Sequence, residues 1–182
     1  MNAVAAYGLL AHGLIFGALV ALLPLGGLRQ RAALTATALA LIAGIAPVMH
    51  GTFGTPSLTL LQLALLHLAN RAPSPLTYRP ALGLLIFALL FYPAALSWGA
   101  FDPYALGYQP WPLLAALVPL AGVLWWQRQD VWLIMLAVNL AAYATGAFAN
   151  LWDVLFDPLL VLLALIIVGR RAVTRVIASR IR

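Results

Sequence analysis

The sequence contains no cysteine, no lysine and no glutamate. Without cysteine, thiol–disulfide exchange, iron–sulfur ligation and thiolate metal sites are excluded. Without lysine, a retinal-type Schiff base is excluded as well. Charge of either sign is scarce, because 8% of the 182 residues are charged, whereas soluble domains carry about 25%. An ordinary soluble domain is therefore excluded.

Hydrophobic side chains make up 65% of the residues, and the mean hydropathy is +1.02. The charged residues are ten arginines and four aspartates, which give a formal net charge of +6. A helix needs roughly 20 apolar residues to cross a bilayer. Seven apolar segments are candidates, at residues 4–25, 32–49, 57–69, 80–98, 111–127, 131–148 and 151–168. We therefore expect an all-α integral membrane protein, with a polytopic domain over residues 1–168 and a basic tail over residues 169–182.

Two of these segments allow more than one interpretation. Segment 4–25 differs from a cleavable signal peptide, because its start is uncharged and its apolar stretch is full length. We expect it to span the membrane. Segment 57–69 is short for a span at about 1.5 Å of rise per residue. It is either a span lengthened by residues 53–56 or a re-entrant half-helix.

The positions of the arginines favour one topology, because cytoplasmic loops gather basic residues. With seven spans, all ten arginines fall on one side of the membrane. With six spans and a re-entrant half-helix, Arg29 and Arg31 fall on the opposite side from the rest. We expect a seven-helix bundle with its amino terminus outside and its carboxyl terminus in the cytoplasm. The basic bias and the Arg-, Ala- and Leu-rich composition indicate the inner membrane of a bacterium.

The basic tail has an amphipathic pattern. Its apolar residues fall on one helical face and its arginines fall largely on the other, as in a helix that lies on an anionic leaflet. The alternative is a plain positive-inside signal without a role in lipid binding. In the first case, the residues at the lipid headgroups are Arg170, Arg171, Arg175, Arg180 and Arg182.

Polar residues follow one another at helical intervals in the sixth segment. Asn139 is near its middle, and Tyr143, Gly146 and Asn150 follow at spacings of four, three and four residues. These spacings put the side chains on one helical face. Asp153 continues the pattern. We expect a polar groove from the middle of the membrane to an outer mouth, because a polar group within a span needs a partner or a function.

Three of the four aspartates, Asp102, Asp153 and Asp157, fall at the predicted outer side, where the chain has no arginine. Unpaired carboxylates there must be hydrated, protonated, bound to a cation or paired with a basic group on another molecule. Asp102 and Asp157 each precede a proline, which is also the ordinary start of a helix. Asp153 lacks that explanation.

His50 lies at the outer end of the second segment, close in depth to the outer aspartates. It could hold a divalent metal with them, or a haem with His12, but no other feature marks either site. We predict no cofactor and no metal. The predicted set of residues that bind a ligand or a partner is Asn139, Tyr143, Asn150, Asp153, Asp157, Asp102 and His50.

One stretch resembles the Gly-Ala-x-Gly-Asn-x-x-Asp-Arg motif of the lipoprotein signal peptidase family. The matching residues are Gly146, Ala147, Asn150 and Asp153. Ala149 replaces the second Gly, Val154 replaces the Arg, and the partner motif is absent unless residues 156–158 are its remnant. The family also differs in its number of spans, which is four, whereas seven are expected here. The resemblance implies an intramembrane hydrolase in which Asp153 and either Asp157 or Asp102 share a proton and activate water.

Three functions follow from these patterns. The favoured hypothesis is a non-catalytic subunit or assembly factor of a membrane complex, whose outer carboxylates pair with basic residues of a protein partner. The second is a small transporter, or a membrane protein that binds a lipid or solute. The third is the aspartyl hydrolase, which needs two carboxylates within hydrogen-bonding reach. Membrane lipids with anionic headgroups are expected partners, and nucleic acid is not.

Overall fold

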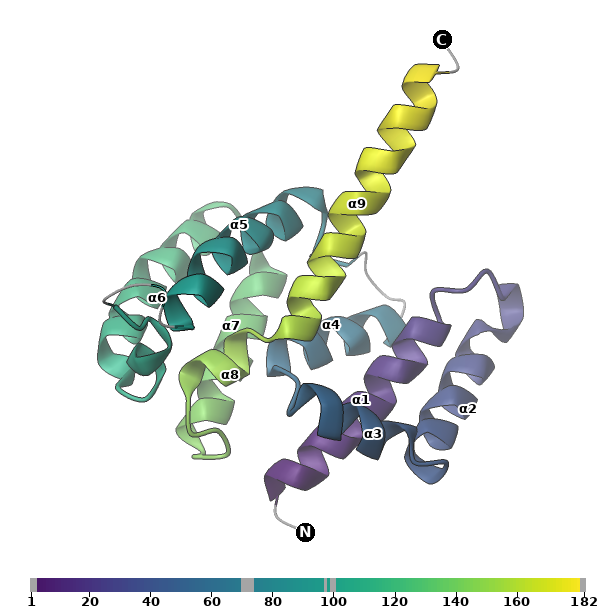
Figure 1. Ribbon diagram of the computed structural model, residues 1–182, viewed down its shortest axis with the longest axis horizontal. Helices are drawn as coiled ribbons and strands as arrows, with labels where there is room; N and C mark the ends of the chain where they lie inside the picture. Colours follow the sequence, from purple (N-terminus) through teal and green to yellow (C-terminus); the bar gives the residue numbers. More distant parts are fainter. Residues whose placement is uncertain (1–2, 70–73, 97, 99–100, 181–182) are drawn as a thin grey trace.

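The protein was analysed as a computed structural model, which describes residues 3–69, 74–96, 98 and 101–180. Within these ranges the fold is all-helical and contains no strand (Figure 1). The elements are α1 (Ala3–Val20), η1 (Gly26–Leu28), α2 (Arg29–Ile42), α3 (Ile45–Phe53), α4 (Leu58–Ala69), α5 (Tyr78–Ala95), η2 (Tyr104–Gly107), α6 (Pro110–Trp126), α7 (Asp130–Ala144), α8 (Leu151–Leu155) and α9 (Pro158–Arg180).

Two helical stretches in the described part of the chain, Tyr78–Ala95 and Leu151–Thr174, are long and apolar enough to cross a membrane. A third crossing is formed if the bent pair Gly26–Ile42 and Ile45–Phe53 counts as one span. The remaining apolar helices are shorter, at Val4–Val20, Leu58–Ala69, Pro110–Trp126 and Asp130–Ala144. By length and composition, the fold is an all-helical one with two to three helices that could cross a membrane.

The second predicted segment is not one continuous helix. The chain bends by 74° between α2 and α3, and Gly44 at the bend has a φ of +81°. This left-handed backbone is readily adopted by glycine, because glycine has no Cβ to clash with the carbonyl. The expectation of one helix over residues 32–49 was therefore wrong, since hydrophobicity carries no information on where a helix bends.

Helices α1 and α2 pack closely through small residues. A Cβ added at Gly17 would lie 2.8 Å from the carbonyl oxygen of Ala33, and one added at Gly13 would lie 2.9 Å from the side chain of Leu41. Ala36 and Ala40 of α2 are buried. Small residues at this spacing let two helix backbones approach each other, so these residues form a contact within the bundle.

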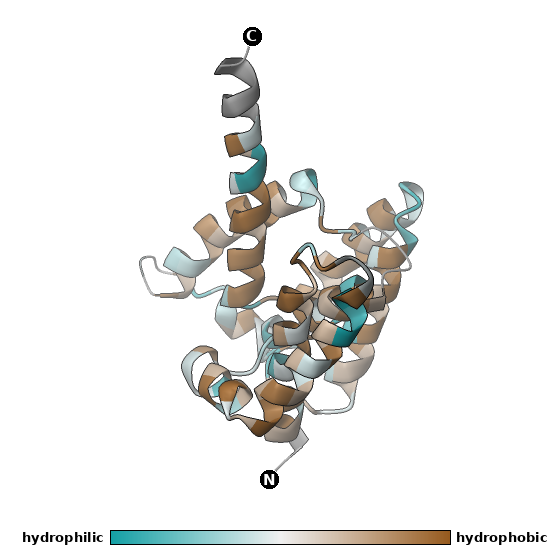
Figure 2. Ribbon diagram, turned by 90° about the vertical axis from the view of Figure 1, so that its right-hand side faces the viewer, coloured by the Kyte–Doolittle hydropathy of each residue, from teal (hydrophilic) through white to brown (hydrophobic). Residues whose placement is uncertain are grey.

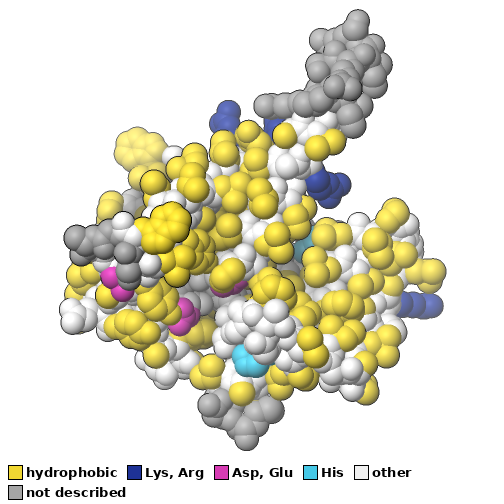
Figure 3. Space-filling model, in the orientation of Figure 1, with side chains coloured by type: hydrophobic (Ala, Val, Ile, Leu, Met, Phe, Trp, Pro, Cys, Tyr) yellow, Lys and Arg dark blue, Asp and Glu magenta, His cyan; other side chains and the backbone are white. Residues whose placement is uncertain are grey.

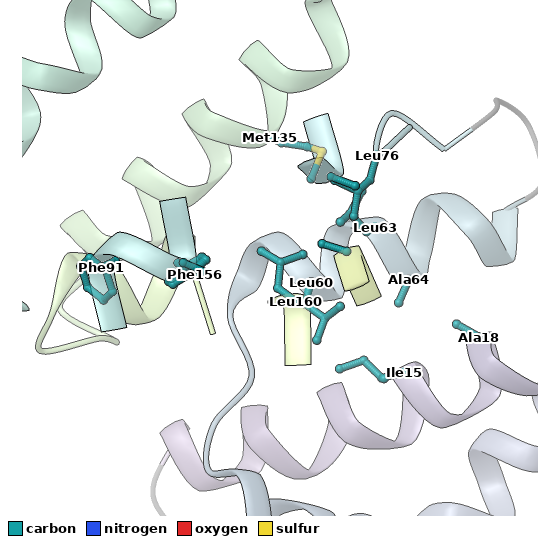
Figure 4. Packing of buried hydrophobic residues seen from close by; sticks show 13 residues of the cluster. Ile15, Ala18, Leu60, Leu63, Ala64, Leu76, Phe91, Met135, Phe156 and Leu160 are labelled. Carbon is teal, nitrogen blue, oxygen red and sulfur yellow. The ribbon is translucent and has the colours of Figure 1, made fainter. Parts of the chain in front are cut away.

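The buried core gathers around α4. Leu60 and Leu63 of α4 belong to one cluster with Ile15 of α1, Met135 of α7 and Leu160 of α9 (Figure 4). On the far side of the cluster, aromatic rings join α5 to α8 and the turn before α9. The rings in contact are Phe87, Phe91, Tyr92, Trp152 and Phe156. The core thus connects the early helices to the late ones.

Large apolar side chains cover the outside of the molecule. The exposed fraction is 72% for Leu34, 84% for Ile42 and 87% for Trp126. Hydrophobic residues, in brown, occur along most of the helices in Figure 2, and yellow hydrophobic side chains cover much of the face in Figure 3. Soluble monomers rarely expose apolar patches of this extent. This surface suits an environment of lipid.

Two predicted segments end or break earlier than expected. Helix α7 ends at Ala144, and Gly146 follows with a φ of +75°, so residues 131–148 do not form one helix. Segment 151–168 is divided into α8 and α9 by extended backbone at Phe156. Helix α9 then continues through Gly169 to Arg180 and projects from the body (Figure 1). Arg175 and Arg180 belong to this helix, and Arg182 lies outside the described residues.

Candidate functional site

The polar residues predicted to bind a ligand or a partner, including those of the expected groove, are distributed over four separate sites. Helix α7 ends before Gly146, so the spacing that joined Asn139 to Asn150 is not continued by one helix. Tyr143 is half-buried and Gly146 is exposed. Asn139 is buried in the bundle, whereas Asn150 is buried at the start of α8. Each of the remaining predicted residues has its own surroundings.

The first site is at Asp153, where a carboxylate meets a phenol. The Tyr104 hydroxyl donates a hydrogen bond of 2.8 Å to the Asp153 carboxylate. Burial, and then the hydrogen bond to Asp153, raise the pKa of Tyr104 above its ordinary value. Asp102 accepts a hydrogen bond of 2.9 Å from the Tyr104 backbone N–H and is exposed. Asp102 therefore binds the first residue of the short helix η2 from two positions before it.

Asn150 and Trp152 hold η2 against α8. The Asn150 side-chain carbonyl accepts from the Trp152 backbone N–H at 2.8 Å, and its amide donates to the Tyr104 carbonyl at 3.2 Å. The Trp152 indole N–H donates to the Pro103 carbonyl at 2.9 Å. Asn150 thus starts a helix and fixes a loop at the same time. The Asn150 side chain is therefore engaged in structural hydrogen bonds.

The second site is at Asp157, which joins the starts of two helices. Its carboxylate accepts from the backbone N–H of Leu160 at 2.9 Å and from that of Ser57 at 2.6 Å. The Ser57 hydroxyl in turn accepts from the Leu60 backbone N–H at 3.2 Å. Asp157 is 6% exposed and Ser57 is fully buried. The carboxylate is therefore satisfied within the chain by the positive ends of α4 and α9.

No hydrogen bond joins two carboxyl groups among the described residues: the partner of Asp153 is Tyr104, and the partners of Asp157 are backbone N–H groups. Two carboxyl groups that share a proton, as the hydrolase hypothesis requires, are hydrogen-bonded to each other. The geometry gives that hypothesis no support.

The third site is a buried chain of polar side chains around Asn139. Its amide N–H donates to the Thr59 hydroxyl at 2.8 Å, and its carbonyl accepts from the Gln62 amide at 2.7 Å. The Thr59 hydroxyl reaches the carbonyl of Val154 at 3.4 Å. These contacts join α4 to α7 and α8 with Asn139 only 2% exposed. The sequence predicted Asn139, but its partners on α4 were missed.

The fourth site is a pair of histidines. The rings of His12 and His50 lie 5.9 Å apart between centroids, and both contact the Gly54 carbonyl, at 2.9 Å from His12 Nε2 and 3.1 Å from His50 Nδ1. Gly8 makes room for His50, because a Cβ there would lie 2.5 Å from the imidazole. Within the described ranges, no group of three or more His, Cys, Asp or Glu residues is placed to hold a metal ion.

A cavity of about 1210 Å³ lies between α5 and the hairpin of α6 and α7. Its walls are mainly apolar and include Leu84, Leu117, Leu124 and Met135. Its inner end reaches Thr59 and Asn139, which already pair with each other. A ligand pocket usually measures about 300–1,000 Å³ and has mostly apolar walls, so this cavity is large enough for a substantial apolar ligand.

The opposite end of the cavity is polar, and we call it the mouth. It is formed by the connection before α5, the start of α5 and the turn between α6 and α7. Its polar residues are Ser74, Thr77, Arg79, Gln127, Arg128, Gln129 and Asp130. A second hollow of about 350 Å³ adjoins it, shares Thr77 and Arg79, and adds Tyr78 and Arg171.

The mouth was missed by the sequence analysis, which placed the binding residues at the outer end of the bundle. Arg79, Arg128 and Arg171 come from three separate elements and follow no common motif. The only sequence signal was the excess of arginine in the turns. For Arg79 and Arg128 that signal was interpreted as topology alone, because a positive-inside bias explains it. Arg171 was predicted to lie at the lipid headgroups, but only as part of the amphipathic tail.

Comparison with known proteins found no matching family model, no similar curated protein and no solved structure of similar fold. The local resemblance to lipoprotein signal peptidases therefore has no support beyond the residues that carry it.

Proposed function

We propose that this protein is a membrane protein that binds a lipid, with an apolar chain of the lipid in the cavity beside α5 and its polar end at the mouth. The observation that carries the proposal is the cavity of about 1210 Å³, which has apolar walls and polar residues at one end. This is the distribution that an amphipathic ligand requires, because each part of the ligand then meets a surface of its own polarity.

The inner end of the cavity supports an apolar chain over a polar solute. The Asn139 amide donates to Thr59, and its carbonyl accepts from Gln62. These polar groups are therefore engaged by the protein itself. A sugar or amino acid at this depth would leave its own polar groups without partners, at a cost of a few kcal/mol each.

The hydrogen bonds of the three outer aspartates favour lipid binding over the accessory-subunit hypothesis. That hypothesis depended on outer carboxylates that lack a partner within the chain. Asp102, Asp153 and Asp157 each accept a hydrogen bond from a residue of this chain. The need for basic residues on another protein is therefore weaker than the sequence alone suggested.

We further propose seven spans, an outer amino terminus and the bacterial inner membrane. Contacts at the arginine-rich end support this topology. Arg29 at the start of α2 donates to the carbonyls of Ala21 and His67, each at 3.0 Å, so the ends of α1 and α4 lie beside it. Arg171 of α9 stacks on Tyr78 at the start of α5, 4.8 Å from the ring centroid. Basic residues gathered at one end are typical of a cytoplasmic face.

The test compares substitutions at two helical glycines that both have open space around them. Gly83 of α5 lines the cavity, whereas Gly122 of α6 does not, and a Cβ added at either would meet nothing within 4 Å. We expect Gly83→Phe to fill part of the cavity and to reduce the lipid that is retained by the purified protein, measured by native mass spectrometry. Gly122→Phe is the matched control and should retain lipid as the natural sequence does. Equal retention by the two variants would refute the proposal.

A further inference from the structure

We propose that the mouth recognises the phosphate of an anionic lipid headgroup, with Arg128, Arg79 and Arg171 as its cationic partners. This inference rests on the proposed function, because it names the class of lipid that the cavity receives. Three arginines and one aspartate, Asp130, lie around the mouth and the adjoining hollow. The balance of charge is positive, and guanidinium groups bind phosphate oxygens in a bidentate manner.

The strongest observation is the backbone of Arg128. Its φ is +55°, in the left-handed region, and all four other positive-φ residues that the structure describes are glycines: Gly26, Gly44, Gly54 and Gly146. The turn is a Schellman motif, in which the Arg128 N–H donates to the Trp125 carbonyl at 3.1 Å and the Gln129 N–H donates to the Leu124 carbonyl at 2.9 Å. Glycine is the usual residue at the position of Arg128 in this motif.

An arginine at a position suited to glycine is unfavourable for the backbone, because its Cβ crowds the neighbouring carbonyl oxygen. Strain of this kind persists where the side chain has another use. The side chain in question lines the mouth of the cavity. Arg128 and Arg79 both line the mouth, and no ion pair joins either of them to an aspartate among the described residues.

Arg171 lines the hollow that adjoins the mouth. Its guanidinium lies 4.8 Å from the centroid of the Tyr78 ring, a cation–π contact that restricts the side chain next to the smaller hollow. Arg79 follows Tyr78 directly and lines both hollows. The three arginines thus belong to α5, α9 and the turn between α6 and α7. Arg79 connects the mouth, where Arg128 lies, with the adjoining hollow, where Arg171 lies.

The apolar cavity behind the mouth determines which phosphate compound fits. A free phosphate would use the arginines but leave the cavity of about 1210 Å³ without an occupant. A zwitterionic lipid would fill the cavity but bring a cation to an arginine-rich mouth. An anionic phospholipid matches both parts, since its headgroup carries a net negative charge and its acyl chain is apolar.

The experiment compares two lipids with identical acyl chains, phosphatidylglycerol and phosphatidylcholine, added to the delipidated full chain in detergent. Native mass spectrometry reports the fraction bound. We expect preference for phosphatidylglycerol in the natural sequence and a loss of about tenfold in its affinity in Arg128→Gln, the size of one charge-assisted hydrogen bond. The control is Arg31→Gln, which removes an exposed arginine that is not at the mouth and should change nothing.

A second variant separates binding from folding. Arg128→Gly removes the guanidinium and also relieves the left-handed backbone, so the unfolding temperature should rise while the affinity for phosphatidylglycerol falls. If Arg128 were retained only for stability, Arg128→Gly would lower the unfolding temperature and leave the affinity for phosphatidylglycerol unchanged. Unchanged lipid preference in both Arg128 variants would overturn the inference.

The outcomes also distinguish this inference from the proposed function. If Gly83→Phe reduces retention of both lipids but the arginine variants bind as before, the cavity binds lipid and the headgroup inference fails. If Gly83→Phe has no effect, the cavity proposal itself fails. Full displacement of phosphatidylglycerol by inorganic phosphate would identify the mouth as a site for free phosphate and would overturn the lipid headgroup.

Discussion

The backbone N–H of Ser57 donates a hydrogen bond of 2.6 Å to the carboxylate of Asp157, across a separation of 100 residues. The same carboxylate caps α9 through the N–H of Leu160, while the Ser57 hydroxyl caps α4. Two helix starts are therefore joined in a buried position by one aspartate. Its oxygens accept from the backbone N–H groups at both helix starts, which have no partner within their own helices.

Replacing Asp157 should therefore destabilise the fold strongly. We expect Asp157→Ala to lower the free energy of unfolding by roughly 2 to 4 kcal/mol, because a helix cap is lost and the buried Ser57 N–H is left without a partner. Asp157→Asn retains an acceptor and should cost less. Thermal unfolding in detergent measures both.

Asp102 provides the comparison for this prediction. It also accepts a hydrogen bond from a backbone N–H at the start of a short helix, but it is exposed, so water can replace its contact with Tyr104. Asp102→Ala should cost under about 1 kcal/mol. The explanation given for Asp157 would be wrong if the two alanine variants were equally stable.

Substitutions of the buried residues Asn139 and Thr59 should have non-additive effects on the free energy of unfolding. The amide of Asn139 donates to the Thr59 hydroxyl at 2.8 Å. Interhelical hydrogen bonds in membrane proteins average about 0.6 kcal/mol and reach about 1.7. We expect a double-mutant cycle of Asn139→Leu and Thr59→Val to give a coupling free energy of that size. Either single change already breaks the hydrogen bond, so the second change has no bond left to remove. Thr35→Val, on the exposed side of α2, should combine additively with Asn139→Leu.

The stability of the protein should fall in strongly alkaline solution through Tyr104. Burial and the hydrogen bond to Asp153 raise the pKa of Tyr104 above its ordinary value of 10.0. The unfolded chain then loses this proton near pH 10 while the folded chain retains it. The stabilisation from Tyr104 is therefore complete below about pH 10 and is lost as the pH rises through the raised pKa.

The measurement is the free energy of unfolding of the natural sequence and of Tyr104→Phe between about pH 8 and pH 11. The variant lacks the hydrogen bond and should be less stable at neutral pH. The gap between the two proteins should narrow above about pH 10. If the difference in the free energy of unfolding stays constant over this range, the loss of stability does not arise from the raised pKa of Tyr104.

Part of this fold could be read from the sequence, because apolar runs determine where helices can lie. The runs predicted the helical fold. The proline after Asp157 indicated a helix start, which the structure bears out. Each of these depends on local pattern, and local pattern is what a single sequence contains.

The remaining features depend on contacts between distant segments. The partners of Asn139 are Gln62 and Thr59, which lie 77 and 80 residues away along the chain. The mouth joins Arg79 to Arg128, and no periodicity connects them. The bend at Gly44 arises from backbone conformation, because glycine permits it without requiring it. The outer groove predicted from the spacing after Asn139 assumed a helix that ends at Ala144.

The topology can be tested with single cysteines, since the natural chain has none. Thr52 and Ala105 are exposed at the turns predicted to lie outside, and Ser74 is exposed at a turn predicted to lie inside. With seven spans, a reagent that cannot cross the membrane should label Thr52→Cys and Ala105→Cys in intact cells. Ser74→Cys should react only after the membrane is opened. If α4 does not cross, positions 52 and 74 lie on the same side and should show the same labelling, because no span then separates them.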